Sequence, residues 1–349
     1  MAIANPPSEY TTSNLPPHLS TKTPNNKLTN PDTVWASLIT NMEYIPGLLT
    51  LHHSLYNPKP DPRAESNNNQ SLPSTSSRYP FVAFYTSTFP PEGLKALQSR
   101  GISAQLVPSV TPASTKTYTQ DPRFSETWNK LVAFSLTEYE RVVLLDGDIL
   151  VRRNMDELME IELGEGERVF AASHACACNP MKKPHYPETW VPTNCAFTTQ
   201  HANPTLAQRT GAPSNAGVAM LNSGVLVIHP SAKIFKEITT ALQDAEKTSK
   251  YDFPDQELLS EVFRDRWVTL PYVYNALKTL RWESVHGTIW RDEEVKAVHY
   301  IFAKKPWHED VEDSGNLDGL GLDEPGVWWW RANFERRGLE VDRGIEDGI

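Results

Sequence analysis

The segment WNKLVAFSLTEYERVVLLDGDIL, residues 128–150, decides the fold. Its second half contains the apolar run VVLL, which predicts a strand buried on both faces. Its first half predicts a helix, because apolar residues recur on one side of it, at Trp128, Leu131, Phe134 and Leu136. A helix that leads into a fully buried strand favours a sheet of the α/β class.

The same alternation continues toward the N-terminus. VWASLITN at 34–41 and PFVAFYTS at 80–87 predict further strands, and helices are expected over 46–56 and 90–100. We therefore predict one α/β domain with a mainly parallel central sheet and flanking helices. Sheets of this class bind ligands at the carboxyl ends of their strands. Polar residues fall at those ends here, at Thr40, Asn41, Thr86, Asp146 and Asp148.

Composition narrows the class of protein. The 349 residues carry a net charge of -10, which argues against a nucleic-acid partner because such proteins need a basic surface. The three cysteines, an odd number, fit a reducing compartment better than secretion. The sequence does not open with a basic and apolar leader, and it has no apolar run of the about 20 residues that span a bilayer. We predict a cytoplasmic protein without a membrane anchor.

The chain divides into an arm, a catalytic domain and a tail. Residues 1–31 are rich in Pro, Ser, Thr and Asn and predict a flexible arm. The domain is expected over 32–335, with a low-complexity loop at 58–78 and a Pro-rich, irregular insert at 171–219. Residues 336–349 are expected to form a C-terminal tail.

The strongest chemical motif is Asp146-Gly147-Asp148, directly after the buried strand. Two carboxylates separated by one small residue can reach the same hard cation, and such a cation offsets the charge of a departing diphosphate. Gly147 would leave the turn open to a ligand. On its own the motif is equally compatible with a solvated acidic turn.

His299, in KAVHYIFAKKPW, gives that motif its context. An imidazole beside two carboxylates suits Mn2+ better than Ca2+ or Mg2+, which favour oxygen ligands. Lys304 and Lys305 follow closely, and a lysine there could neutralise a diphosphate oxygen. The alternatives are a structural histidine and ordinary surface lysines.

Two further segments could contact a sugar. Asn222-Ser223-Gly224 offers an amide, a hydroxyl and a permissive backbone, although the tripeptide is also a common turn. Acidic and amide side chains gather at the start of the next helix, where carboxylates also serve as simple caps. These are Asp252, Asp255 and Gln256.

Together and in this order, these segments resemble glycosyltransferase family 8, over roughly Val34 to Trp307. The resemblance implies a Rossmann-like domain of the GT-A type and a retaining transfer of a hexose from a UDP-hexose donor, with Mn2+ or another divalent cation. It implies Asp146, Asp148 and His299 as metal ligands, and Asp255 and Gln256 near the anomeric carbon. It implies UDP-sugar contacts from Leu38, Thr40, Asn41, Tyr44, Arg123, Lys130, Asn222, Ser223, Gly224 and Lys305. Asp252 is grouped with the catalytic pair.

The chain departs from the family pattern in two places. Phe302 stands where the family has a glycine beside the phosphates, which leaves open a decayed transferase that binds nucleotide sugar without turnover. The segment that carries the self-glucosylated tyrosine of glycogenin-like members has no tyrosine between Tyr274 and Tyr300. We therefore expect transfer to a separate hydroxyl acceptor, a small polyol or glycan, over glycogenin-like self-glucosylation. A homodimer stays open.

Two groups of residues have competing interpretations. A structural zinc site would draw on the cysteines and histidines of the insert, but their spacing lacks paired C-x-x-C elements, so buried or idle thiols are the simpler interpretation. The residues concerned are His174, Cys176, Cys178, His185, Cys195 and His201. Trp328, Trp329 and Trp330 could stack on a sugar, but adjacent tryptophans cannot all face one ligand, so we predict packing.

Overall fold

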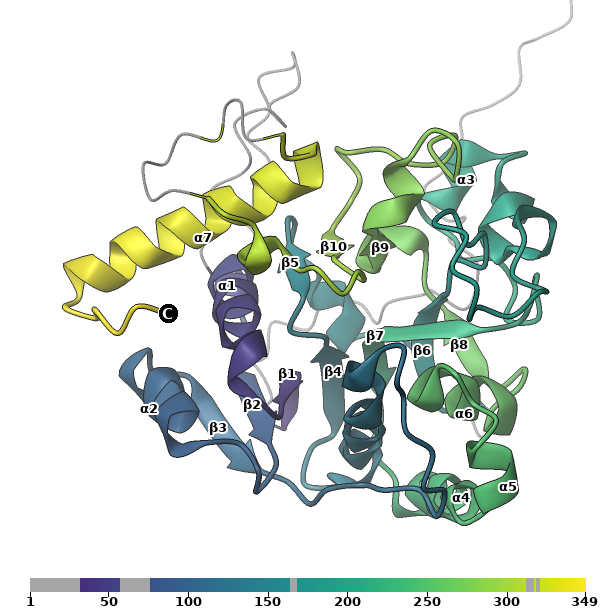
Figure 1. Ribbon diagram of the computed structural model, residues 1–349, viewed down its shortest axis with the longest axis horizontal. Coiled ribbons are helices and arrows are strands. Elements are labelled where there is room, and N and C mark those ends of the chain that lie inside the picture. The colour runs from purple at the N-terminus through teal and green to yellow at the C-terminus, as the bar shows by residue number, and fades with distance from the viewer. Residues whose placement is uncertain (1–31, 57–75, 164–167, 312–316, 318–320) are drawn as a thin grey trace, which may run out of the picture.

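The computed structural model of the chain describes residues 32–56, 76–163, 168–311, 317 and 321–349 (Figure 1). The predicted arm at 1–31 and most of the predicted loop at 58–78 lie outside these residues. Of that loop, residues 76–78 are described, Ser77 among them. It is buried, and its hydroxyl accepts a hydrogen bond from the indole of Trp35 at 2.7 Å.

Within the described residues, seven strands form the central sheet and three more form a small second sheet (Figure 1). The order in the large sheet is β3-β2-β1-β4-β7-β6-β8, and in the small one β5-β10-β9. Only β7 runs against its neighbours in the large sheet, so the prediction of a mainly parallel sheet is confirmed. The strands are β1 (Thr33–Ile39), β2 (Phe81–Tyr85), β3 (Ser103–Leu106), β4 (Arg141–Leu145), β5 (Ile149–Val151), β6 (Phe170–His174), β7 (Leu221–Ile228), β8 (Trp267–Thr269), β9 (Ala276–Leu277) and β10 (Ala297–His299).

Helices cover both faces of the large sheet, because its strands alternate apolar side chains between two cores. Trp35 and Leu145 face the core under α1 and α2, whereas Val34 and Leu144 face the core under α4 and α6. The helices predicted over 46–56 and 90–100 are confirmed as α1 and α2. The helices are α1 (Ile45–Tyr56), α2 (Pro91–Ser99), α3 (Pro204–Ala207), α4 (Ala232–Leu242), α5 (Ala245–Thr248), α6 (Pro254–Val262) and α7 (Glu324–Asp342).

The helix predicted before β4 is a 3₁₀ segment over Thr127–Ser135. The apolar spacing explains this outcome: Trp128, Leu131 and Phe134 are three residues apart, which is the period of a 3₁₀ helix. These three side chains are buried in the core, while Thr127 and Lys130 share another side of the segment and line a pocket. The local winding therefore places Lys130 at that pocket.

The antiparallel direction of β7 brings two distant motifs together. Leu145, at the carboxyl end of β4, pairs with Val225 near the amino end of β7. The backbone N–H of Asp146 then donates a hydrogen bond to the carbonyl of Gly224 at 2.9 Å. The residues after β4 and those that open β7 consequently meet at one edge of the sheet.

The small sheet positions a third motif at the same edge. His299 of β10 pairs with Ile149 of β5, the residue directly after Asp148. The N–H of Tyr300 donates to the carbonyl of Asp148 at 3.0 Å. Pairing of β5 with β10 thus carries His299 to the acidic motif across about 150 residues of sequence.

Two predicted boundaries differ from the structure. The irregular insert was expected from Ala171, but 171–174 belong to β6, a central strand buried on both faces; its run of small residues carries no alternation that would predict it. The tail was expected from residue 336, but α7 runs through that position and lies across α1 (Figure 1). Arg336 is buried there and donates to Glu340 one turn later at 2.7 Å.

The tryptophans of α7 pack, as predicted. Trp328, Trp329 and Trp330 are all buried in the core that also holds the small sheet. The ring of Trp329 contacts that of Trp307, with centroids 5.6 Å apart. Trp328 lies under the guanidinium of Arg152, 3.4 Å from its ring centre. The three tryptophans therefore join α7 to the rest of the domain.

Candidate functional site

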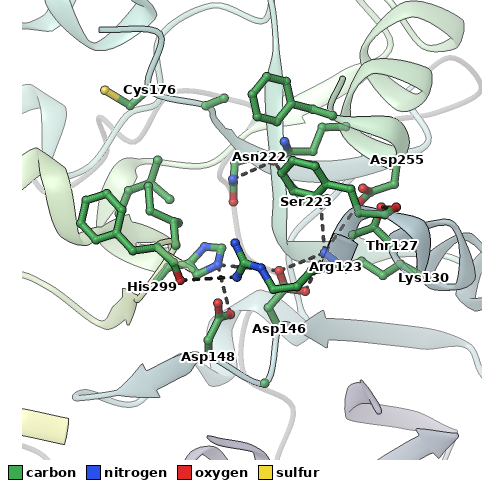
Figure 2. Close-up of a pocket in the computed structure, with 18 of the residues that line it drawn as sticks. Arg123, Thr127, Lys130, Asp146, Asp148, Cys176, Asn222, Ser223, Asp255 and His299 are labelled. Carbon is green, nitrogen blue, oxygen red and sulfur yellow. Dashed lines mark hydrogen bonds and ion pairs between the residues drawn. The ribbon is translucent and has the colours of Figure 1, made fainter. Parts of the chain in front are cut away.

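A pocket opens at the edge where the ends of β1 and β4 meet the start of β7 (Figure 2). Its lining includes most of the predicted site residues, drawn from separate elements. Those on the pocket wall are Leu38, Thr40, Asn41, Tyr44, Arg123, Lys130, Asp146, Gly147, Asp148, Asn222, Ser223, Asp255, Gln256 and His299. Gly224 and Lys305 lie directly behind this lining, and Asp252 lies elsewhere.

The three predicted metal ligands converge. Asp146, Asp148 and His299 each present an atom within 4.8 Å of the others. Nε2 of His299 lies 3.2 Å from Oδ1 of Asp148 and 3.7 Å from Oδ2 of Asp146, and Figure 2 shows the imidazole directed toward both carboxylates. Buried Oδ1 of Asp148 receives no hydrogen bond from any described residue. Such a carboxylate oxygen beside an imidazole nitrogen fits a shared cation.

The orientation of His299 is fixed from behind by amides. Its Nδ1 lies 2.9 Å from Oδ1 of Asn275, and the amide nitrogen of Asn275 donates to Oδ1 of Asn222 at 2.8 Å. Because Oδ1 can only accept, Nδ1 of His299 carries a proton, and in the neutral ring Nε2 presents its lone pair to the carboxylates. That is the tautomer a metal ligand requires. Sequence reasoning missed Asn275, since a lone asparagine carries no motif.

Gly224 is required by this arrangement. A Cβ on Gly224 would lie 2.3 Å from Cε1 of the His299 ring. The imidazole therefore packs closely against the start of β7, and any side chain at 224 would displace it. For Gly147 the protein imposes no such limit, because a Cβ there would meet nothing closer than 3.8 Å.

Two lysines balance the two carboxylates: Lys130 is half-buried at the pocket lining, and Lys305 is buried. Nζ of Lys130 lies 2.8 Å from Oδ1 of Asp146 and 3.7 Å from Oδ2 of Asp255. Nζ of Lys305 donates to Oδ2 of Asp148 at 2.5 Å and to the carbonyl of Tyr300 at 2.8 Å. Lys305 is only 1% exposed, so it lies under the motif rather than in the open pocket.

These contacts make the two carboxylates unequal. Burial raises the pKa of Asp146; Lys130 opposes that shift and the charge of Asp148 adds to it. Burial acts on Asp148 in the same direction, but the charge of Lys305 opposes it most strongly, and the pKa of Asp148 is held below its ordinary value. Burial also lowers the pKa of Lys130, but Asp146 and Asp255 more than offset this, and its pKa is raised. The pocket floor therefore carries fixed charges of both signs.

At the start of α6, the structure separates the three predicted residues. Asp255 is buried, its side chain makes no cap, and it points toward Lys130. Gln256 accepts hydrogen bonds at Oε1 from the amide of Asn222 at 2.7 Å and the N–H of Ser223 at 3.2 Å. Asp252 is half exposed, pairs with Lys116 at 2.9 Å and does not line the pocket. Its position just before α6 turns it away from the pocket, so the structure does not bring Asp252 together with Asp255 and Gln256.

Arg123 is held at the pocket by Asp121, which the sequence did not single out. Nε and Nη2 of Arg123 donate to the two Asp121 oxygens at 2.8 and 2.5 Å. Nη1 donates to the Tyr44 hydroxyl at 3.0 Å and to the carbonyl of Phe302 at 3.4 Å. The guanidinium therefore joins the end of the first strand to the segment after His299.

Phe302 is accommodated by an aromatic neighbour. Its ring stacks on Trp282, with centroids 5.9 Å apart and planes 29° from parallel. The backbone of Phe302 stays at the pocket lining, where its carbonyl accepts from Arg123. Trp282 thus provides a ring against which the side chain of Phe302 packs, at the position where the family has glycine.

The insert supplies one wall of the pocket. Asn179, Lys183, Tyr186 and Trp190 line it, and Trp190 stacks on Phe253 with centroids 4.6 Å apart. These residues were not predicted individually, because an irregular segment has no periodicity from which a lining face can be read. Cys176 lines the same wall, across the pocket from the carboxylates (Figure 2).

Solved structures share this architecture. The glycosyltransferase GlyE of Streptococcus pneumoniae TIGR4 aligns with 90% of this chain and 65% of its own, with a TM-score of 0.51 and 15% identity. An active-site mutant of LgtC aligns over 90% of this chain and all of its own, also with a TM-score of 0.51 and 15% identity. At these identities the likeness defines the fold, which is that of the GT-A glycosyltransferases.

Sequence comparisons define the family. The profile of Glycosyl transferase family 8 matches residues 36–311, and the chain belongs to that family. It is a hexosyltransferase. Galactinol synthase 2 of Ajuga reptans is 28% identical over 247 residues, which is 69% of this chain and 77% of that protein. Galactinol synthase 3 of Arabidopsis thaliana is 25% identical over 265 residues, 75% of this chain and 74% of that one.

Among the described residues, the helices are too short or too polar to cross a membrane.

Proposed function

We propose that this chain is a metal-dependent, retaining hexosyltransferase that uses a UDP-hexose and transfers the sugar to a separate, small hydroxyl acceptor. The observation that carries the proposal is the convergence of Asp146, Asp148 and the oriented Nε2 of His299 on the lining of one pocket. Family membership supports the reaction class.

Different residues of the pocket would bind the metal, the diphosphate and the nucleoside. Asp146, Asp148 and His299 would hold Mn2+, which when bound offsets the charge of the leaving diphosphate. Lys130 and Arg123 add fixed positive charge at the lining, and Lys305 keeps Asp148 ionised from below. Leu38, Thr40, Asn41 and Tyr44, at the end of β1, would contact the uracil and ribose.

The reacting face of the sugar would lie against β7 and α6. Asn222, Ser223 and Gln256 form one hydrogen-bonded unit there, and Asp255 lies beside Lys130. In the transfer, the bond from the anomeric carbon to the diphosphate oxygen breaks and a bond to the acceptor oxygen forms. The acceptor proton passes to the departing diphosphate. The side chains of this face fix the sugar so that the incoming oxygen arrives on the same side.

A separate acceptor fits the geometry better than self-glycosylation. The hydroxyls nearest in sequence to the glycogenin-like acceptor position are Ser284 and Thr288, which are exposed and absent from the pocket lining. The insert narrows the pocket with Tyr186 and Trp190, which suits a polyol or short sugar. Because relatives are named galactinol synthases, a galactosylated polyol is the first product to test.

The experiment measures UDP release by the full chain with UDP-glucose, UDP-galactose and UDP-N-acetylglucosamine, each with polyol or glycan acceptors. We expect release that needs both an acceptor and Mn2+, that stops with EDTA and that returns on adding Mn2+. Donor binding with no turnover on any acceptor would favour the decayed transferase instead. A ladder of hexose additions in the intact mass would favour self-glycosylation.

The cytoplasmic location and a homodimer stay predictions. Fractionation of cells that express the full chain, and light scattering of the purified protein, would test them.

A further inference from the structure

All three cysteines of the chain meet at one point, although only two of them are close in sequence. Cys176, Cys178, Cys195 and His286 each present a ligand atom, and these four atoms lie within 4.8 Å of one another. Nε2 of His286 is 3.2 Å from Sγ of Cys178 and 3.3 Å from Sγ of Cys195. The three cysteines lie in the segment between β6 and β7, and His286 lies in the segment before β10.

The spacing matches a tetrahedral metal shell. With Zn–S of about 2.3 Å and Zn–N of about 2.0 Å, tetrahedral geometry places sulfur and nitrogen about 3.5 Å apart and two sulfurs about 3.8 Å apart. The observed sulfur–nitrogen distances are close to the first value. A shell of three thiolates and one imidazole is soft, which selects zinc over the Mn2+ or Mg2+ that carboxylates prefer.

A second layer orients the histidine. Nδ1 of His286 lies 2.8 Å from Nε2 of His201, so Nε2 of His286 is the nitrogen that faces the sulfurs. Its ring also packs edge-on against Phe197, with centroids 5.5 Å apart. Ligating histidines in proteins characteristically use their second nitrogen in a hydrogen bond of this kind. His286 is fully buried, and so is Cys195.

The position of the cluster explains what a metal would do. The loop after Cys178 contains Asn179 and Lys182 in left-handed conformations, with φ of 43° and 50°. Asn179, Lys183 and Cys176 line the pocket. The segment between β6 and β7 has little regular secondary structure to hold it. A cross-link from Cys176, Cys178 and Cys195 to His286 would anchor that wall to the domain.

We propose that Cys176, Cys178, Cys195 and His286 form a structural Zn2+ site that fixes the wall of the pocket formed by the insert. Four protein ligands close the shell, so the ion has no open position for a substrate and takes no part in the transfer. His201 is a positioning residue for His286. This proposal does not depend on the proposed UDP-hexose chemistry, and it is tested separately by the zinc content of the protein.

The test begins with the unmodified full chain, purified without chelators and without an affinity tag that binds metal. Elemental mass spectrometry of the purified protein should give a zinc content of about one ion per chain. Protein in which Co2+ replaces zinc should show the visible absorption bands of a tetrahedral thiolate site. The three thiols should resist a thiol reagent until a strong chelator removes the metal. Zinc-free protein with three reactive thiols, or an intact mass that reveals a disulfide, would overturn the proposal.

Variants locate the ligands. Cys195→Ser and His286→Gln should each lose at least about tenfold in bound zinc and lower the melting temperature. Two matched controls should retain it: His185→Gln, in the same insert but outside the cluster, and Asp148→Asn, in the other cluster. If a ligand variant does not fold, chelator titration of the unmodified chain still decides. Full zinc content in both ligand variants would overturn the assignment.

Discussion

The cluster of Asp146, Asp148 and His299 opens into the pocket, whereas the cluster of three cysteines and His286 lies within the wall of that pocket. The first offers two hard oxygens and one nitrogen, and its three ligands leave room for a substrate to complete the shell. The second offers three sulfurs and one nitrogen, and is complete without a substrate. The two clusters therefore suit different proposed roles, the first in chemistry and the second in structure.

The two clusters also share one structural feature, the way in which their histidine is held. In each, the nitrogen of the histidine that faces away from the ligands is held by one polar side chain: Asn275 for His299 and His201 for His286. In each, the histidine comes from the segment between β8 and α7 and meets ligands that follow a central strand. Exchange of a single ligand or of its supporting residue therefore tests whether the two sites are independent.

The largest effect is expected from Asp148→Asn. Loss of this carboxylate removes a metal ligand, and we expect transfer to fall by at least about a thousandfold, roughly 4 kcal/mol of transition-state stabilisation. Lys305 loses its charged partner, but burial already lowers its pKa, so it can become neutral and keep its bond to the Tyr300 carbonyl. Initial rates at saturating Mn2+, with circular dichroism and zinc content as checks of the fold, measure this. Wild-type rates would remove the acidic motif from the site.

A second pair of variants separates two aspartates three residues apart. Asp255→Asn should lower the rate by about a hundredfold, because Asp255 is buried beside Lys130 at the pocket lining. Asp252→Asn is the matched control, since its side chain is half exposed and pairs with Lys116 outside the pocket. We expect that control to stay within about twofold of the parent. Equal losses in the two variants, compared at saturating donor, would contradict this placement of α6.

The sequence predicted the first cluster well, for physical reasons. Asp146 and Asp148 form a local motif after a buried strand, and the central strands β1, β2 and β4 follow from apolar runs. The sequence did not predict Asn275, because this residue orients His299 through a contact that exists only in the folded chain. Asp252 lies outside the pocket that Asp255 and Gln256 line, and the sequence could not separate the three, because residues just before a helix can face either way and no periodicity decides which.

For the second cluster, the sequence pointed to all three cysteines but not to His286, the histidine that the fold brings beside them. His174, His185 and His201 are closer in sequence to the cysteines, but His174 contacts backbone carbonyls of Met220 and Ala212 and His201 lies one layer out. His286 is 91 residues from Cys195, and no spacing rule connects them. Ligands joined by long-range packing become visible only once the fold is known.

A smaller effect is expected from Asn275→Ala. His299 would lose the acceptor that fixes its tautomer, so we expect the Mn2+ concentration for half-maximal rate to rise by about 10- to 100-fold. The rate at saturating Mn2+ should fall less, because the three ligands remain. Metal titration of initial rates measures the shift, and zinc content should not change. A lower rate with no shift in the Mn2+ requirement would mean that Asn275 serves the sugar through Asn222 and not the metal.

The smallest effect is expected from His201→Gln, the counterpart of that variant in the second cluster. Glutamine can still offer a carbonyl oxygen near Nδ1 of His286, so the orientation of the ring is weakened rather than lost. All four zinc ligands stay in place, and zinc as purified should remain near one per chain. The loss should appear in affinity, as about a tenfold faster release of zinc to a competing chelator.

Transfer rates at saturating donor should stay within about twofold, because His201 is not part of the pocket lining. A matched His185→Gln variant, in the same insert but without a contact to His286, should release zinc at the parent rate. Equal release from both variants would show that the bond between His201 and His286 does not support the ligand, and that the two clusters are not built alike.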